Sequence, residues 1–212
     1  MTHAFDKDYW DEHWQRRDTD GPGSMSGNPP NPYLARETGE LLPGTALDAG
    51  CGAGAEAIWL ASSGWQVTAV DISAQALARA AQRAAADGVG DRVQWIEADL
   101  SAWNPDTRFD LVTTHYAHPA MPQLEFYDRI AAWVAPGGTL LIVGHLHAHA
   151  PEPGHGPHPP AEASVTAAAI TARLDDAVWK VVTAEEATRT LAGPGGHAVS
   201  LHDVVVRAAR RT

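Results

Sequence analysis

Short apolar runs alternate with amphipathic stretches across the middle of the chain. The apolar runs predict strands over residues 45–50, 66–71, 93–99, 109–116 and 139–144. The stretches between them predict helices over residues 55–63, 74–86 and 124–134. Ser73 stands where a helix N-cap is expected, and Gly64 and Gly88 follow the ends of two of the helices. Strands and helices that alternate at this spacing predict a parallel sheet with helices on both faces.

The two ends of the chain depart from this alternation. Residues 6–16 are expected to form a short amphipathic helix, and the Gly/Pro/Asn-rich residues 18–32 a loop. The His- and Pro-rich residues 146–164 have no apolar periodicity, so a second loop is expected there. A helix is predicted over residues 165–174. Two last strands, over 179–183 and 203–207, are close enough to form a hairpin-like pair at the end of the sheet.

Length and charge limit the class of protein. The 212 residues suit one domain with an appendage, and 15 Lys+Arg against 26 Asp+Glu give a formal charge of −11. This acidic balance argues against nucleic-acid and anionic-membrane partners, which need clustered cations. The single cysteine excludes an intrachain disulfide, which fits a reducing compartment. No apolar run is long enough for a membrane span and no signal-peptide core is recognised, so a cytoplasmic protein is expected.

A glycine-rich turn at residues 47–54, Leu-Asp-Ala-Gly-Cys-Gly-Ala-Gly, closes the first predicted strand and opens the first helix. Glycines allow a tight turn and a close approach of the backbone to a ligand. Position 55 is alanine, so the Gly-x-Gly-x-x-Gly pattern of dinucleotide-binding proteins is absent. Asp71 and Asp99 end the next two strands, at the sheet edge where α/β proteins bind ligands. With Asp48 for an ammonium group, Asp71 for ribose hydroxyls and Asp99 for an adenine amino group, an adenosine ligand that carries an amino acid is indicated.

Over residues 43–145 the chain resembles the class I S-adenosylmethionine-dependent methyltransferases. The motifs LDAGCGAG, VTAVDIS, VQWIEADL, FDLVTTHYAH and VAPGGTLLIVG occur in the family's order and spacing. The resemblance implies an α/β fold, Rossmann-like and doubly wound, with a seven-stranded, mostly parallel sheet and an antiparallel last strand. It also implies S-adenosylmethionine as cofactor and S-adenosylhomocysteine as product. The residues expected to bind the cofactor are Asp48, Gly50, Cys51, Gly52, Asp71, Ile72, Asp99, Leu100 and His115; Cys51 is included only as a small residue of the turn, without a redox role.

The narrower pattern looks most like small bacterial methyltransferases of the tellurite-resistance and thiopurine types. It includes a Trp-rich N-terminal segment, Gly64-Trp65 before the second strand and a C-terminal HDVVVRA stretch. This resemblance implies a small-molecule acceptor with an O, N, S or metalloid centre, and a monomer or homodimer. We divide the chain into an N-terminal cover over the active site, residues 1–44, and an S-adenosylmethionine-binding domain, residues 45–212.

Candidate catalytic residues follow the fourth and fifth strands. His118 and Tyr116 lie in the segment that borders the acceptor pocket in this fold, and imidazole suits general-base work near neutral pH. His145 ends the fifth strand. If that strand continued, His145, His147 and His149 would share one face and offer a metal three imidazoles. The Pro and Gly content of this stretch, which also contains His155 and His158, argues against a fixed site, and no metal is expected.

Aromatic residues of the N-terminal cover are the remaining candidates. Trp10 and Trp14 are about one helical turn apart, and an aromatic ring favours a sulfonium cation. Both side chains would equally serve to anchor the helix on the core. Tyr33, after the NPPNP stretch, is a weaker candidate for the same cover.

Two other readings remain open from the sequence. A protein that binds S-adenosylmethionine without catalysis, as a sensor or partner subunit, would carry the same cofactor signature. A nicotinamide-dependent oxidoreductase is disfavoured by Ala55 and by the paired C-terminal strands. Turnover of S-adenosylmethionine separates the first reading from an enzyme, and competition between the two cofactors separates the second.

Overall fold

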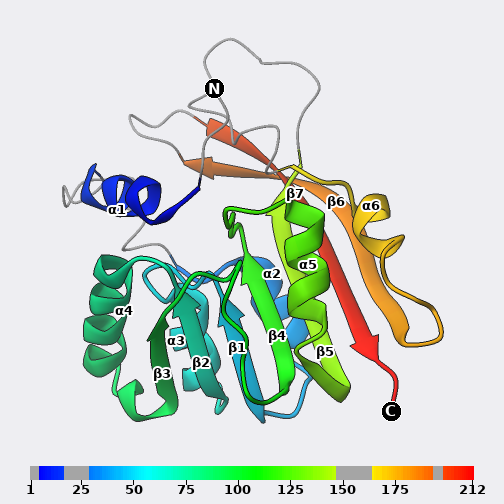
Figure 1. The fold of residues 1–212 in the computed structure, drawn as a ribbon, viewed down its shortest axis with the longest axis horizontal. Helices are drawn as coiled ribbons and strands as arrows, with labels where there is room; N and C mark the ends of the chain where they lie inside the picture. The colour runs from blue at the N-terminus through cyan, green and yellow to red at the C-terminus, as the bar shows by residue number, and fades with distance from the viewer. Residues whose placement is uncertain (1–4, 17–28, 147–163, 193–197) are drawn as a thin grey trace.

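One seven-stranded sheet forms the centre of the molecule, with strand order β3-β2-β1-β4-β5-β7-β6 (Figure 1). The computed structural model describes residues 5–16, 29–146, 164–192 and 198–212. The strands are β1 (Thr45–Ala49), β2 (Gln66–Asp71), β3 (Val93–Glu97), β4 (Phe109–His115), β5 (Val134–His145), β6 (Trp179–Ala192) and β7 (Ala198–Arg210). The helices are α1 (Lys7–Arg16), α2 (Pro32–Thr38), α3 (Ala55–Ser62), α4 (Ala74–Ala86), α5 (Gln123–Ala131) and α6 (Ala167–Thr171), with a 3-10 turn, η2 (Gly90–Arg92).

The direction of the strands confirms the predicted fold class. Strands β1 to β5 pair in parallel, whereas β7 runs antiparallel to both β5 and β6. The chain builds outward from β1 to β3 and then returns to place β4 on the other side of β1. The carboxyl ends of β1 and β4 therefore form the point of strand-order reversal, where open α/β sheets bind ligands.

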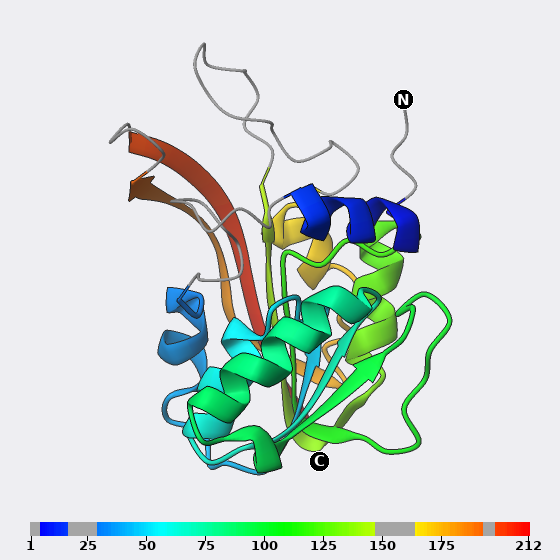
Figure 2. The same cartoon turned by 90° about the vertical axis from the view of Figure 1, so that its left-hand side faces the viewer.

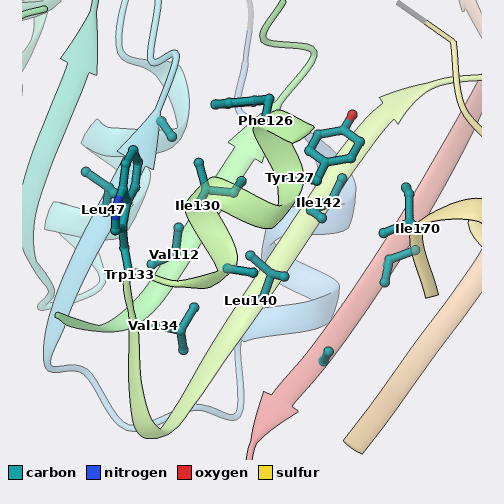
Figure 3. Packing of buried hydrophobic residues seen from close by; sticks show 14 of the residues in the cluster. Leu47, Val112, Phe126, Tyr127, Ile130, Trp133, Val134, Leu140, Ile142 and Ile170 are labelled. Atoms are coloured by element: carbon teal, nitrogen blue, oxygen red, sulfur yellow. The ribbon is translucent and has the colours of Figure 1, made fainter. Parts of the chain in front are cut away.

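Helices cover both faces of the sheet, as Figure 2 shows from the side. One apolar core lies between the sheet and the helices α5 and α6, and the other between the sheet and α2, α3 and α4. Successive side chains of β5 point to opposite faces of the sheet, so this strand contributes to both cores. Leu140 and Ile142 face the first core (Figure 3), and Leu141 and Val143 face the second. All four side chains are fully buried, which explains why β5 reads as one continuous apolar run.

Several predicted boundaries were wrong, each for a local reason. Helix α5 ends at Ala131 instead of residue 134, because Val134 already pairs with Phe109 of β4. Strand β5 thus begins five residues earlier than the predicted residue 139, with an irregular register across the Pro-Gly-Gly segment. Strand β3 ends at Glu97 instead of residue 99, and α6 is shorter than the predicted 165–174.

Two features were not predicted. Helix α2 is short, but Asn31 caps it by accepting a hydrogen bond from the Tyr33 amide, and Leu34 is fully buried against the sheet. The predicted hairpin-like pair is confirmed, but β6 and β7 are 14 and 13 residues long, far beyond the expected five each. We call their outer part, residues 183–192 and 198–203, the β6–β7 ribbon.

No helix in the described part of the chain is long and apolar enough to cross a membrane. Of the predicted loop over 18–32, residues 18–28 lie outside the described residues and Pro32 already begins α2; of the predicted loop over 146–164, only residues 146 and 164 are described. His147, His149, His155 and His158 therefore lie outside the described residues.

Candidate active site

The glycine-rich turn connects β1 to α3 at the carboxyl edge of the sheet. Gly50, Gly52 and Gly54 have φ angles of 81°, 50° and 78°, which L-residues with side chains rarely adopt. A Cβ atom on Gly50 would lie 2.3 Å from the Cβ of Ala117, and one on Gly52 would lie 3.0 Å from the Trp14 ring. The turn therefore needs glycine both for its backbone angles and for the close neighbours above it.

Asp48 is a buried carboxylate with an unsatisfied oxygen. Its side chain is 1% exposed, and Oδ2 has no hydrogen-bond partner among the described residues. Burial raises the pKa of Asp48 well above its usual range, and the nearby carboxylates of Glu56 and Asp71 raise it further. A cation brought to this oxygen would relieve both effects.

Asp71 ends β2 and binds the backbone of the turn. Its Oδ2 accepts a hydrogen bond from the Gly52 amide (2.8 Å), and its Oδ1 accepts one from the Ser73 amide (2.9 Å). Burial raises the pKa of Asp71, against the lowering effect of these backbone hydrogen bonds. Each carboxylate oxygen retains a second lone pair, so hydroxyl donors can still be accepted.

The remaining candidates for the cofactor side follow β2 and β3. Asp99 Oδ1 accepts the Ser101 amide (2.8 Å) in a turn that leaves the carboxylate partly exposed. Leu100 is 6% exposed and belongs to the core beneath α5. The Ile72 carbonyl accepts a hydrogen bond from Lys7 of α1 (3.2 Å). Cys51 is buried, and burial raises its thiol pKa, so the thiol stays protonated.

Helix α1 lies across the carboxyl edge of the sheet (Figures 1 and 2). Toward β3 and α4, Lys7 pairs with Glu97 (3.0 Å), and the Ser73 hydroxyl donates to Asp11 (2.9 Å). Trp14 is 4% exposed and packs over the glycine turn. Toward β4, the Trp10 indole donates to the carbonyl of His118 (3.3 Å). One helix thus contacts both ends of the site.

The histidines that follow β4 and β5 are held among aromatic rings. The His118 ring lies 5.7 Å from Phe5 and 5.5 Å from His145, measured between centroids, and His145 lies 4.5 Å from Tyr116. Burial lowers the pKa of His118, and burial together with the neighbouring His118 lowers the pKa of His145 to about 4. Both imidazoles are therefore neutral at physiological pH.

His115 ends β4 on the same edge. Its Nδ1 lies 3.4 Å from the Thr113 hydroxyl, and its Nε2 has no partner among the described residues. Burial lowers the pKa of His115, with the carboxylate of Glu56 acting in the opposite direction. The ring is thus a neutral group beside the acidic residues of the turn.

Tyr116 joins the site to the β6–β7 ribbon. Its φ angle is 56°, and its hydroxyl donates to Asp203 (2.7 Å) while accepting from Arg189 (2.8 Å) and Asn31 (3.3 Å). Arg189 also forms an ion pair with Asp203 (2.5 Å), which is fully buried. Burial, followed by the charge of Asp203, raises the pKa of Tyr116 far above its usual value. The phenol is a fixed, neutral donor.

The sequence identified most polar groups near the carboxyl ends of the central strands, but not their supports. Asn31, Gln123, Arg189 and Asp203 were missed as site residues; Asp203 lies in the HDVVVRA stretch, but nothing in the sequence shows that its side chain reaches the loop after β4. Asn31 caps α2, and its backbone N–H donates to Glu56 Oε1 (3.0 Å). Tyr33 lies in α2, where it packs in the core on that face of the sheet. Within the described residues no group of three His, Cys, Asp or Glu side chains is arranged to hold a metal ion.

Comparisons with known proteins agree with this geometry. Residues 46–138 match a family model described as a methyltransferase domain. Ribosomal RNA small subunit methyltransferase C from Alcanivorax borkumensis is 34% identical over 110 residues, covering 49% of this chain and 33% of that protein. Trans-aconitate 2-methyltransferase from Streptomyces avermitilis is 34% identical over 142 residues, covering 57% of this chain and 52% of its own length.

The solved structure of TehB from Haemophilus influenzae superposes with a TM-score of 0.67 at 15% identity, covering 97% of this chain and 67% of that one. This likeness shows a shared fold. The chain spans about a third of the length of the ribosomal RNA relative and about half of that of the trans-aconitate relative. The matched part contains β1 to β4 and the glycine turn, whereas the β6–β7 ribbon lies outside the family model.

Proposed function

We propose that the chain is a class I S-adenosylmethionine-dependent methyltransferase that methylates a small-molecule acceptor by in-line transfer. The observation that carries this proposal is a set of three buried atoms at the carboxyl edge of the sheet that have no hydrogen-bond partner among the described residues: Asp48 Oδ2, His115 Nε2 and His118 Nε2. The Asp48 oxygen suits a cationic group of the cofactor, and the imidazole nitrogens suit groups that donate a hydrogen bond.

The residues of the turn fit the proposed cofactor. Asp48, with Glu56 and Asp71 nearby, supplies negative charge for an ammonium group and a sulfonium centre. Asp71 retains lone pairs for ribose hydroxyls, and Asp99 has a partly exposed carboxylate for an adenine amino group. Gly50, Cys51 and Gly52 allow the close approach, while Ile72, Leu100 and His115 would contact the ligand from the strand ends.

Helix α1 supports the role of an N-terminal cover. Its contacts with Ser73 and with the His118 carbonyl hold it over both the turn and the loop after β4. The ring of Trp14 over Gly52 would face the sulfonium region, where aromatic rings favour a cation. A helix that covers the site keeps water out of it, and methyl transfer requires this exclusion of water.

When bound, S-adenosylmethionine supplies an electrophilic methyl group on a sulfonium sulfur, and the electron pair of the broken bond remains on that sulfur. The protein must align the acceptor and take up any proton that the acceptor loses. We assign the base role to His118 Nε2, which becomes an imidazolium and later returns the proton to water. Tyr116, whose hydroxyl already donates to Asp203, acts as a positioning residue, and neutral His145 lines the acceptor side.

A small-molecule acceptor is favoured over a macromolecule. The net charge of −11 opposes binding to nucleic acid, and the trans-aconitate relative provides a small-molecule precedent within the family. The ribosomal RNA relative, which the chain covers by only 33%, provides the contrary precedent, so the acceptor must be tested directly.

The decisive experiment measures cofactor binding and turnover together. Calorimetry should detect micromolar binding of S-adenosylmethionine and S-adenosylhomocysteine, and no competition from nicotinamide cofactors. Release of S-adenosylhomocysteine should then be followed with a panel of phenols, thiols, nitrogen heterocycles and oxyanions, and with ribosomal RNA. Absence of binding would refute the proposal. Binding without turnover of any acceptor would favour the sensor reading, and turnover of RNA alone would refute the small-molecule acceptor.

A further inference from the structure

Gln123 is a buried amide that lies beside His118. It is the first residue of α5, and it is only 5% exposed. Its Nε2 donates a hydrogen bond to the carbonyl of Ala117 (2.9 Å). Its Oε1 lies 3.0 Å from Nδ1 of His118.

These two contacts fix how both side chains are oriented. A carbonyl oxygen can only accept, so the Gln123 group that faces Ala117 must be the NH₂ group. The Gln123 group that faces His118 is then the amide oxygen Oε1, which can only accept. The His118 nitrogen that faces it, Nδ1, must therefore carry the hydrogen. In a neutral imidazole one nitrogen is protonated and the other bears a lone pair. His118 is therefore protonated on Nδ1, and its bare nitrogen is Nε2.

The bare nitrogen has no partner within the described residues. His118 is 7% exposed, and Nε2 is buried without a hydrogen bond. Phe5 and His145 pack on the ring, and contacts with ring faces leave an in-plane lone pair unsatisfied. An acceptor nitrogen left in this state is unfavourable unless a ligand donates to it.

The bare nitrogen determines which ligand can bind there. A lone pair on nitrogen only accepts a hydrogen bond, so a ligand that satisfies Nε2 must carry an O–H or N–H group.

We propose that Gln123 is a positioning residue that holds His118 in the Nδ1–H tautomer, and that the methyl acceptor is a molecule with an O–H or ring N–H group. This inference rests on the proposed function. The acceptor's hydrogen bonds to His118 Nε2. As the new bond to carbon forms, the proton moves to Nε2, and the sulfonium becomes a neutral thioether. The sum of charges is unchanged, because the positive charge passes from sulfur to the imidazolium.

The tautomer can be measured without turnover. Long-range proton–nitrogen correlation spectra of the protein labelled with ¹⁵N-histidine distinguish protonated from bare ring nitrogens, and the spectrum of His118→Gln identifies the His118 signals. We expect a protonated Nδ1 and a bare Nε2 at neutral pH. A protonated Nε2 with a bare Nδ1 would overturn the assignment of Gln123.

A substitution then tests the positioning role. Gln123→Glu keeps the size of the side chain but places a carboxylate against Nδ1–H, which should raise the pKa of His118 by about one unit or more. The pH below which kcat/KM falls should rise by the same amount, because His118 must be neutral to act as the base. The other titratable group that packs on His118 is His145, so its signals are followed in the same titration. An unchanged His118 midpoint would refute the positioning role.

The matched control is Gln94→Glu, the same chemical change at an exposed position of β3, which should leave the His118 titration unchanged. Calorimetric binding of S-adenosylmethionine, measured on the same samples, separates this inference from the proposed function. If the predicted tautomer is observed but S-adenosylmethionine does not bind, only the proposed methyltransferase function is refuted. Turnover restricted to acceptors whose reacting atom carries no hydrogen, such as carboxylates and thiolates, with cofactor binding intact, would refute the acceptor class.

Discussion

The cofactor side and the acceptor side of the candidate site are built in different ways. The cofactor side consists of strand ends and the turn of β1 and β2, with Asp71 bonded to backbone amides only two and nineteen residues away. The acceptor side gathers groups from α1, α2, β5 and the β6–β7 ribbon around the loop after β4. Tyr116, for example, bonds to Asp203, which is 87 residues away. Local contacts make the cofactor side recognisable in the sequence, whereas distant contacts leave no short motif for the acceptor side.

The largest effect is expected on the acceptor side. His118→Ala should lower kcat by about 10²–10⁴ for an acceptor that must lose a proton, the usual range for a general base. Affinity for S-adenosylmethionine should stay nearly unchanged if the two sides are separate. Steady-state kinetics and calorimetry check this, with His202→Ala on the ribbon as the matched control. A loss of cofactor binding in His118→Ala would show that the two sides are not separable.

The next effect belongs to the cofactor side. Asp71→Ala should weaken S-adenosylmethionine and S-adenosylhomocysteine alike by about ten- to a hundredfold, because hydrogen bonds to a charged group contribute about 1.5–3 kcal/mol. Calorimetry provides the measurement. Asp87→Ala, at the exposed end of α4, removes a carboxylate far from the turn and should bind normally. Equal affinities in Asp71→Ala and the unsubstituted protein would remove Asp71 from the cofactor side.

A third substitution should affect stability and binding in opposite directions. Burial raises the pKa of Asp48, so the folded state holds this proton more tightly than the unfolded chain. The carboxylate therefore costs stability as pH rises through that raised pKa. Asp48→Asn should raise the melting temperature of the free protein at neutral pH by about 2–4 °C, for a gain of about 1 kcal/mol. The same change should weaken cofactor binding. A lower melting temperature would contradict this account of Asp48.

The smallest effect is expected where α1 contacts the cofactor side. Asp11→Ala removes the hydrogen bond from Ser73 and the ion pair with Lys7, both near the surface. Such contacts contribute up to about 1 kcal/mol, so cofactor affinity should fall less than tenfold. Asp8→Ala, at an exposed position of the same helix, is the control. A larger loss than in Asp71→Ala would mean that α1 contributes more to binding than the strand end.

The residues of the cofactor side can be predicted from the sequence better than those of the acceptor side, for physical reasons. The central strands are buried on both faces and read as apolar runs, so their order and the positions of Asp48, Asp71 and Asp99 follow from the pattern. The ribbon has the residues Thr-Ala-Glu-Glu-Ala-Thr-Arg-Thr over 183–190, where half-buried and exposed positions alternate without an apolar signal. Its length was therefore underestimated. Gln123 was read as lying just outside a helix that it begins, because nothing in the sequence shows that its amide faces His118.

Helix α5 is attached to both sides of the site. At its start Gln123 holds His118 and the Ala117 carbonyl, and near its end Arg129 donates to the carbonyls of Leu100 (2.9 Å) and Trp103 (2.8 Å), in the loop after β3. A rigid-body shift of this helix, about 13 Å long at 1.5 Å per residue, displaces both loops together. The two ligands then share one thermodynamic linkage: by whatever factor the acceptor changes cofactor affinity through α5, the cofactor changes acceptor affinity by the same factor.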